Sequence, residues 1–328
     1  MMLYAQNYRT ILGHECLSAC LSNYLFNRGI NIDGSDIFFL GDGFVCEYEK
    51  EKMLYKVNTY NCNFRFLQKY EIPYQYGTKK LQNEACVFLE NCIKKEKEII
   101  IKVTSNCLKY NRIYNQPNGS PHCINIIGSR ENSFYISDGY IPMHNPVTFN
   151  GWISQKDIIE AWSKEGFFYI LLSGDYGTLI DLERRKVNGL VSQKIKAGIE
   201  NYLFYAKLNN NSYFSGISAL NVFFNDVTSY ANITNDFKKF MFDINYNLKF
   251  YGFISYREML LNELYRIRMD YCVINKFRNI VEKWKNWCLF LVKIGVLNRK
   301  EMLNDFIKET NEIISEENKV LIMIWHIL

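Results

Sequence analysis

The segment that decides the fold is Gly13-His14-Glu15-Cys16-Leu17-Ser18-Ala19-Cys20-Leu21, close to the N-terminus. It places a cysteine in the first turn of a short helix, because apolar residues then recur at helical spacing up to Leu25 and Gly29 follows as a stop. A helix start offers free backbone N–H groups and the positive end of the helix dipole, which lower the pKa of a thiol and can hold an oxyanion. We therefore expect Cys16 to be a nucleophile with a lowered pKa.

A second region supplies the base that such a thiol needs. Residues 120–128 predict a β-strand that starts near His122, and residues 134–138 predict the next strand, which ends at Asp138. A thiol needs an imidazole partner to ionise at neutral pH, and the imidazole needs an acceptor on its other nitrogen. Since adjacent antiparallel strands can bring these ends together, the pattern predicts a catalytic triad of Cys16, His122 and Asp138.

The other histidines are weaker candidates for the base. His326 lies in an apolar C-terminal segment and is expected to be structural, whereas His144 lies in a loop bounded by prolines. His14 stands two residues before Cys16 and is a candidate for the lining of the substrate pocket.

Two other interpretations of these residues compete with the triad. In the first, Cys16 is a buried helix cysteine and His122 is a strand histidine with satisfied hydrogen bonds. In the second, His14, Cys16, Cys20 and Cys46 bind zinc, but no paired Cys-x-x-Cys or His-x-x-x-His accompanies them. The triad is the stronger hypothesis, and the structural interpretation stays open.

The predicted secondary structure divides the chain into two parts. With 328 residues and 48% hydrophobic content, it can bury one large core or two modest ones. Helices come first and an antiparallel sheet follows up to about residue 175, which predicts an α+β catalytic domain over 1–175. Apolar residues then recur at helical spacing, which predicts an α-helical domain over 176–328. The helices expected there cover 191–208, 217–230, 255–271, 274–294 and 301–314.

Charge and targeting signals exclude several classes of function. The net charge of +5 is far below that of a typical nucleic-acid-binding domain. The first 13 residues lack the apolar region of a signal peptide, and no apolar run is long enough to span a bilayer. Ten cysteines spread over a long chain form no dense disulfide framework. We expect a cytoplasmic protein with reduced thiols and no membrane association.

Several motifs resemble the N-terminal domain of the butirosin biosynthesis protein H family. His-x-Cys stands before an apolar helix and is followed by Gly29-Ile30-Asn31-Ile32 and Phe38-Phe39-Leu40-Gly41-Asp42-Gly43-Phe44. The later signature of the family is a histidine, a strand, a glycine turn and a strand ending in Asp, which matches His122 to Asp138. One departure is Glu15, because family members usually carry His directly before the cysteine.

The resemblance implies a papain-like fold, in which the helix carrying the cysteine packs on an antiparallel sheet and a helical domain covers the substrate pocket. It implies an ATP-independent N-acyltransferase, or amide synthase, of specialised-metabolite (antibiotic) biosynthesis. The expected partners are an acyl or peptidyl carrier protein and a small amine acceptor, with no nucleic acid, no membrane, no cofactor and no metal. A papain-like cysteine peptidase or amidase, with water as the acceptor, is the alternative, and a degenerate papain-like binding module is a third reading.

The resemblance also raises a question about the oxyanion hole. Papain-like peptidases carry a Gln a few residues before the nucleophile, and the nearest one here is Gln6, ten residues before Cys16. We expect the backbone N–H of Cys16 to be one donor of the hole. Gln6, or Asn7 directly after it, is the candidate for the side-chain donor.

Overall fold

The computed structural model describes residues 7–57, 59–95, 97–115, 119–143, 145–172, 177–185, 189–205, 208–210 and 212–328. The chain forms two compact units. Unit 1 consists of Met1–Ile37 and Asn63–Asn188, and unit 2 consists of Phe38–Cys62 and Gly189–Leu328. The structure therefore does not divide at the expected residue 175, and the early segment Phe38–Cys62 belongs with the C-terminal helices.

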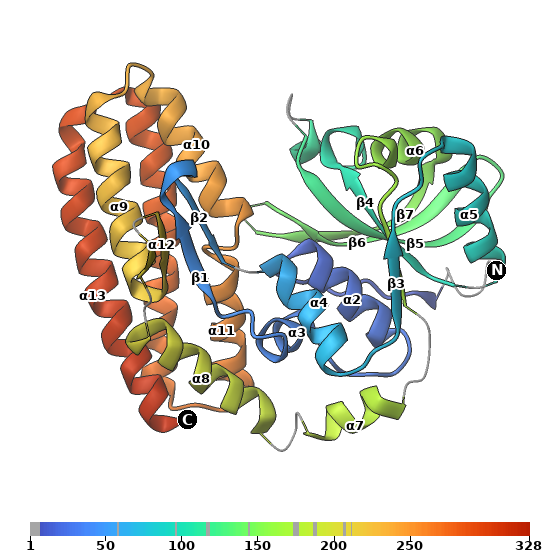
Figure 1. Ribbon diagram of the computed structural model, residues 1–328, viewed down its shortest axis with the longest axis horizontal. Helices are drawn as coiled ribbons and strands as arrows, with labels where there is room; N and C mark the ends of the chain where they lie inside the picture. The colour runs from blue at the N-terminus through green and yellow to red at the C-terminus, as the bar shows by residue number, and fades with distance from the viewer. Residues whose placement is uncertain are drawn as a thin grey trace. The chain divides into compact units, whose positions relative to one another are not determined.

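Unit 1 is an antiparallel sheet with helices on both faces (Figure 1). Its six strands have the order β3-β8-β4-β5-β6-β7, and every pair of neighbours is antiparallel. The expected α+β architecture is confirmed, with an N-terminal helix, an antiparallel sheet and a helical C-terminal region. The elements are α2 (Cys16–Phe26), β3 (Tyr74–Gly77), α5 (Gln82–Lys94), β4 (Ile99–Thr104), η2 (Ser105–Cys107), η3 (Arg112–Tyr114), β5 (Pro121–Arg130), β6 (Ser133–Ile141), β7 (Val147–Ser154), α6 (Gln155–Ser163), β8 (Tyr169–Leu172) and α7 (Gly177–Arg185), while α3 (Gly34–Leu40) and α4 (Thr59–Lys69) run across the boundary between the units.

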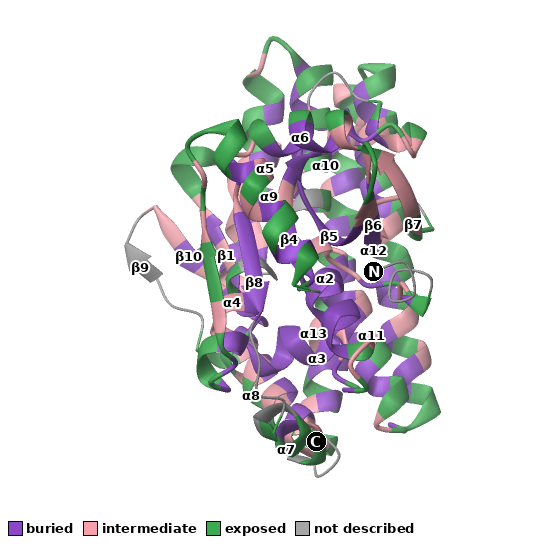
Figure 2. Ribbon diagram, turned by 90° about the vertical axis from the view of Figure 1, so that its right-hand side faces the viewer, coloured by how far each residue is buried: buried purple, intermediate pink, exposed green. Residues whose placement is uncertain are grey.

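The strand β5 shows how the sequence places these helices. Successive side chains of a strand point to opposite faces. Ile124 and Ile126 belong to the apolar core that also contains residues of α5 and α6. Asn125 points to the other face, where its Nδ2 donates to the carbonyl oxygen of Cys20 in α2 at 3.0 Å. Residues 122–128 of β5 are buried, and α2 is largely buried as well (Figure 2).

Close approach of α2 to the sheet depends on a glycine. A Cβ atom at Gly139 of β6 would lie 2.5 Å from Nδ2 of Asn23 and 2.9 Å from Cβ of Ala19. The backbone N–H of Gly13 donates to the carbonyl oxygen of Gly139 at 2.9 Å. These contacts hold α2 and the segment before it against β6.

Unit 2 combines a small sheet with a group of helices. The strand order is β2-β1-β10-β9, so the early hairpin of β1 (Cys46–Glu49) and β2 (Leu54–Val57) pairs with β10 (Tyr213–Ser215). The stacking of Phe44 on Tyr202 adds a second contact between the early segment and the helices. The remaining elements are η1 (Lys50–Lys52), α8 (Val191–Phe204), β9 (Leu208–Asn210), α9 (Gly216–Ile233), α10 (Phe237–Phe250), α11 (Ser255–Arg266), α12 (Tyr271–Leu297), η5 (Lys300–Met302) and α13 (Leu303–Ile327).

The core of unit 2 is aromatic. Trp284 and Trp287 of α12 are completely buried. Phe224 stacks on Trp284 and contacts Trp287 edge-on, and Phe306 stacks on Trp287. The helix expected over 274–294 is α12, which starts three residues earlier and ends at Leu297, where Asn298 caps it in the left-handed conformation with φ 52°. Within the described residues, no helix combines the length and the apolar character needed to cross a membrane.

Candidate active site

Cys16 is the first residue of α2, and Glu15 caps that helix. Glu15 has extended backbone angles (φ −154°, ψ 145°), and its carboxylate accepts from the backbone N–H groups of Leu17 at 3.0 Å and Ser18 at 2.8 Å. The thiol of Cys16 also donates to Oε1 of Glu15 at 3.3 Å. The negative charge of a side chain therefore occupies the start of the helix.

His122, near the start of β5, lies beside Asp138 in the second half of β6. Nε2 of His122 is 3.0 Å from Oδ1 of Asp138. The other carboxylate oxygen, Oδ2, accepts from the hydroxyl of Tyr114 at 2.7 Å and from that of Tyr110 at 2.8 Å. The backbone N–H of Tyr140 donates to Oδ1 at 3.0 Å. Asp138 is completely buried, and these donors replace the water that its charge would otherwise require.

The structure brings the three predicted catalytic residues together. The ring of His122 hydrogen-bonds with the thiol of Cys16 in addition to Asp138. Because Nε2 is engaged by Asp138, Nδ1 is the nitrogen left for the thiol. The contacts run from Cys16 through His122 to Asp138, which is the order that thiol activation by a base and an orienting acid requires.

The pKa of Cys16 contradicts the expectation from its place in the helix. The hydrogen bond with Cys123, burial and the charge of Glu15 raise the pKa of Cys16 well above its ordinary value, although the hydrogen bond with His122 opposes the rise. The N-terminus of α2 fails to lower this pKa because Glu15 takes up the N–H groups and adds a negative charge.

The imidazole and the carboxylate form a charged pair. Burial lowers the pKa of His122, but the charge of Asp138 and its hydrogen bond outweigh burial and raise that pKa to about 10. Burial raises the pKa of Asp138, but the charge of His122 and the hydrogen bonds outweigh it, and the pKa lies below the ordinary value. At neutral pH the site therefore holds a thiol beside an imidazolium, and one proton must leave to give the thiolate–imidazolium pair.

The other expected residues have different positions. Gln6 and His144 lie outside the described residues. His14 is partly exposed in the bend before α2. Cys20 is completely buried, and burial raises its pKa well above the ordinary value, as expected for a packing residue.

The zinc alternative does not match the structure. Cys46 lies in β1 of unit 2, whereas His14, Cys16 and Cys20 belong to unit 1. In the part of the chain that the structure describes, no group of possible metal ligands contains a cysteine or a histidine.

Four residues at the site were missed by the sequence analysis. Tyr110 lies in a turn and Tyr114 ends the short 3-10 helix η3. The sequence around them has no periodic pattern, so nothing in it indicated that these tyrosines belong to the site. Glu15 had a signal, because an acidic residue just before a helix is a common N-cap. Cys123 had one too, because alternation along β5 places it on the face that carries Asn125.

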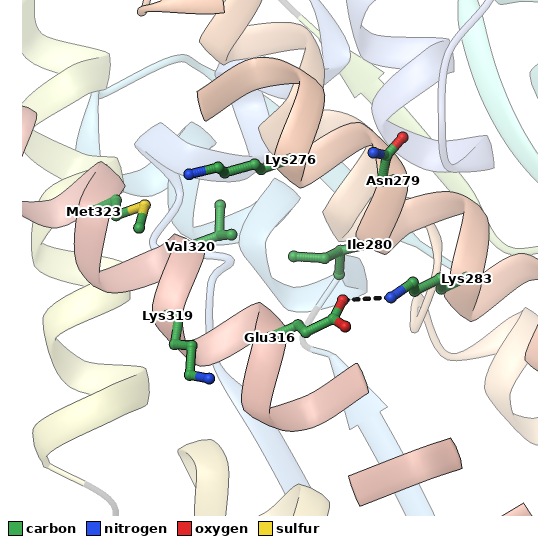
Figure 3. Close-up of a pocket in the computed structure, with 8 residues that line it drawn as sticks. All are labelled: Lys276, Asn279, Ile280, Lys283, Glu316, Lys319, Val320 and Met323. Carbon is green, nitrogen blue, oxygen red and sulfur yellow. Dashed lines mark hydrogen bonds and ion pairs between the residues drawn. The ribbon is translucent and has the colours of Figure 1, made fainter. Parts of the chain in front are cut away.

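A pocket elsewhere offers different chemistry. It lies between α12 and α13 in unit 2 and has a volume of about 310 Å³ (Figure 3). Its floor is apolar, and Lys283 pairs with Glu316 at its edge. The pocket is lined by Lys276, Asn279, Ile280, Lys283, Glu316, Lys319, Val320 and Met323. This lining contains no thiol and no imidazole, so the pocket offers no nucleophile or base of the kind found at Cys16 and His122.

Comparisons with known proteins find similarity only to solved structures. No family model matches the sequence. No curated protein matches it either. A solved structure from Bacillus anthracis, described as a “putative C39-like peptidase”, is similar with a TM-score of 0.35 and 14% sequence identity, over 52% of this chain and 96% of that chain. A score this low carries no argument about the activity of this chain.

Proposed function

We propose that the protein is a cysteine-dependent N-acyltransferase of the papain-like type. The observation that carries this proposal is the contact chain from Cys16 through His122 to the buried Asp138. The nucleophile stands at a helix start, the base stands on a strand, and the orienting carboxylate stands on the neighbouring strand. This arrangement supports covalent catalysis at a carbonyl carbon.

The proposed reaction has two steps. The thiolate of Cys16 attacks the carbonyl carbon of a carrier-protein thioester, the C–S bond to the carrier breaks, and His122 donates its proton to the leaving thiolate. An amine then attacks the acyl-enzyme, His122 takes the amine proton, and the Cys16 thiolate leaves. The sum of the two steps is an amide and a free carrier thiol, with no need for ATP because the thioester is already activated.

The oxyanion in each step needs hydrogen-bond donors. Among the described residues, the backbone N–H of Cys16 has no acceptor, since Glu15 accepts from Leu17 and Ser18 instead. This N–H is therefore available to an oxyanion formed on a carbonyl attacked by the same residue. Gln6 remains the proposed side-chain donor, and His14 remains proposed as part of the substrate pocket.

Acyl transfer is favoured over hydrolysis by the resemblance of the sequence to the butirosin biosynthesis protein H family. We propose the amide-forming enzyme of closthioamide assembly, a papain-like enzyme, as an individual protein that this chain resembles. A peptidase or amidase with the same three residues is the second candidate, because the same acyl-enzyme can react with water. The acyl donor is then proposed to come from an acyl or peptidyl carrier protein, in the synthesis of a specialised metabolite.

The test combines variants with product analysis. Wild-type protein incubated with carrier-bound acyl thioesters and amines should carry an acyl adduct on the peptide containing Cys16, and amide should exceed hydrolysis product. Cys16→Ala should abolish turnover, whereas the matched control Cys20→Ala should keep most of it. His122→Ala should lose roughly a thousandfold or more, as expected when the base of a nucleophile is removed.

Two outcomes would change the assignment. An adduct on Cys20 or Cys46 would remove Cys16 as the nucleophile. Efficient cleavage of ordinary peptides, without an amine-dependent product from any thioester, would favour the peptidase.

A further inference from the structure

The thiol of Cys123 stands next to the proposed nucleophile. Asn125 of β5 donates to the carbonyl oxygen of Cys20, so the face of β5 that carries Cys123, Asn125 and Ile127 is turned toward α2. Asn125 lies opposite Ser137 of β6. Cys123 lies two residues before Asn125 on this face, and Gly139 of β6 lies close to Ala19 and Asn23 of α2.

The two thiols are close enough to act on each other. A side-chain hydrogen bond with Cys123 is the largest cause that raises the pKa of Cys16, and the same bond opposes the rise in the pKa of Cys123. Their accessibility differs, because Cys16 is partly exposed and Cys123 is 3% exposed. A dissolved oxidant therefore reaches Cys16 first, and Cys123 is held where it can react with the product.

We propose that Cys16 and Cys123 form a reversible disulfide when the protein meets a hydroperoxide. This inference rests on the proposed function in one respect, namely that Cys16 is the catalytic thiol. The disulfide would protect that thiol from further oxidation. The reaction requires no group beyond the two cysteines and the peroxide.

The chemistry balances in two steps. The sulfur of Cys16 attacks an oxygen of the hydroperoxide, the O–O bond breaks, and a sulfenic acid and an alcohol (water from hydrogen peroxide) form. The sulfur of Cys123 then attacks the sulfur of Cys16, the S–O bond breaks, and the leaving hydroxide takes the Cys123 proton as water. Cys16 and Cys123 together supply the two electrons that reduce the peroxide, and a dithiol returns them.

Cys20 is the matched control for this pairing. It lies one turn after Cys16 on α2, and the Cβ atoms of residues four apart on a helix are about 5–6 Å from each other. A disulfide needs Cβ atoms about 3.5–4.5 Å apart. Cys20 is thus a nearby thiol that helix geometry keeps from bonding with Cys16.

The experiment is peptide mapping after brief exposure to hydrogen peroxide and alkylation of the remaining thiols. Wild type and Cys20→Ser should both yield a linked peptide pair joining Cys16 to Cys123, which dithiothreitol removes. In Cys123→Ser, Cys16 should instead proceed to sulfinic acid, so the fraction of Cys16 thiol that dithiothreitol recovers should fall severalfold. Cys123→Ala provides a second variant of different polarity.

The readout does not depend on turnover. A link from Cys16 to another cysteine, or equal loss of Cys16 to sulfinic acid in wild type and Cys123→Ser, would overturn the proposal. The mapping of wild type decides the pairing even if both Cys123 variants fail to fold. A protein that forms the linked pair but shows no acyl transfer would refute the proposed function and leave the pairing intact.

Discussion

Asp138 anchors the candidate site at the scale of single residues. Its carboxylate accepts from His122, Tyr114, Tyr110 and the backbone N–H of Tyr140. Hydrogen bonds to the charged form keep a buried carboxylate ionised, and the lowered pKa of Asp138 follows from them together with the charge of His122. A fixed anion beside Nε2 in turn fixes the orientation of the imidazole toward the thiol.

Tyr114 should act as a positioning residue. Its hydroxyl donates to Asp138 at 2.7 Å and is 3.1 Å from Nε2 of His122. We expect Tyr114→Phe to lower kcat about tenfold with little change in KM, because a lost hydrogen bond to a charged group costs about 1.5 kcal/mol or more. Tyr110→Phe is the control, since Tyr110 touches Asp138 without a bond to His122, and its loss should be smaller. A kcat for Tyr114→Phe equal to wild type would exclude this role.

The ionisation of Cys16 should be visible as a pH dependence. Because the pKa of this thiol is raised, only a small fraction is thiolate at neutral pH. We expect the rate of Cys16 alkylation by iodoacetamide to rise about tenfold per pH unit between pH 7 and 9, as the thiolate fraction does below its pKa. The rise should continue while His122 stays protonated, up to its pKa of about 10. A rate that is flat over this range would mean that the thiolate already exists at neutral pH.

At the scale of elements, the cap of α2 contributes to the raised pKa of Cys16, after the hydrogen bond with Cys123 and burial. Glu15 holds the first turn through Leu17 and Ser18 and places its charge beside the thiol of Cys16. Glu15→Gln should lower the pKa of Cys16 and speed its alkylation at pH 7 severalfold, because the amide oxygen can still accept hydrogen bonds but carries no charge. Glu15→Ala should also lose about 0.5–2 kcal/mol of unfolding free energy, which is the usual effect of removing an N-cap.

The control variant for Glu15→Gln is Glu131→Gln, which removes the charge of an exposed carboxylate in the turn between β5 and β6. It should leave both the alkylation rate and the midpoint of urea unfolding unchanged. If Glu15→Gln slowed the alkylation of Cys16, the charge of Glu15 would not be what raises the pKa of this thiol.

The sequence predicted the elements that carry strong periodicity. The start of α2 at Cys16 and the strand that holds His122 are where the pattern placed them, whereas the strand predicted to end at Asp138 continues to Ile141. The assignment of Phe38–Cys62 to unit 2 was missed, because it depends on the pairing of β1 with β10 across more than a hundred residues. Such pairing leaves no local signal, and the same holds for Tyr114, whose role depends on contacts with residues of two strands.

At the scale of the whole molecule, each unit has its own core, and that of unit 2 contains a buried ion pair. Arg257 and Glu317 are almost completely buried. Nε and Nη2 of Arg257 donate to the two carboxylate oxygens of Glu317 at 2.7 and 2.8 Å. Trp284 donates to Glu317 at 3.0 Å, and Arg257 also donates to the carbonyl oxygen of Phe253 at 2.6 Å. The pair joins α11, α12 and α13 in one hydrogen-bonded network.

Breaking this pair should destabilise unit 2 more than replacing it. Glu317→Ala leaves the charge of Arg257 buried without its partner, and we expect a loss of about 3–5 kcal/mol of unfolding free energy. The double variant Arg257→Met with Glu317→Leu removes both charges and keeps apolar volume, so it should lose less unfolding free energy than Glu317→Ala alone.

The measurement is urea unfolding followed by tryptophan fluorescence, which reports on this core because Trp284 and Trp287 lie in it. The exposed pair of Lys283 on α12 and Glu316 on α13 is the control, since Glu316→Ala should cost no more than about 1 kcal/mol. If the double variant were less stable than Glu317→Ala, the pair itself, and not the cost of an unpaired charge, would be what holds α11 to α13.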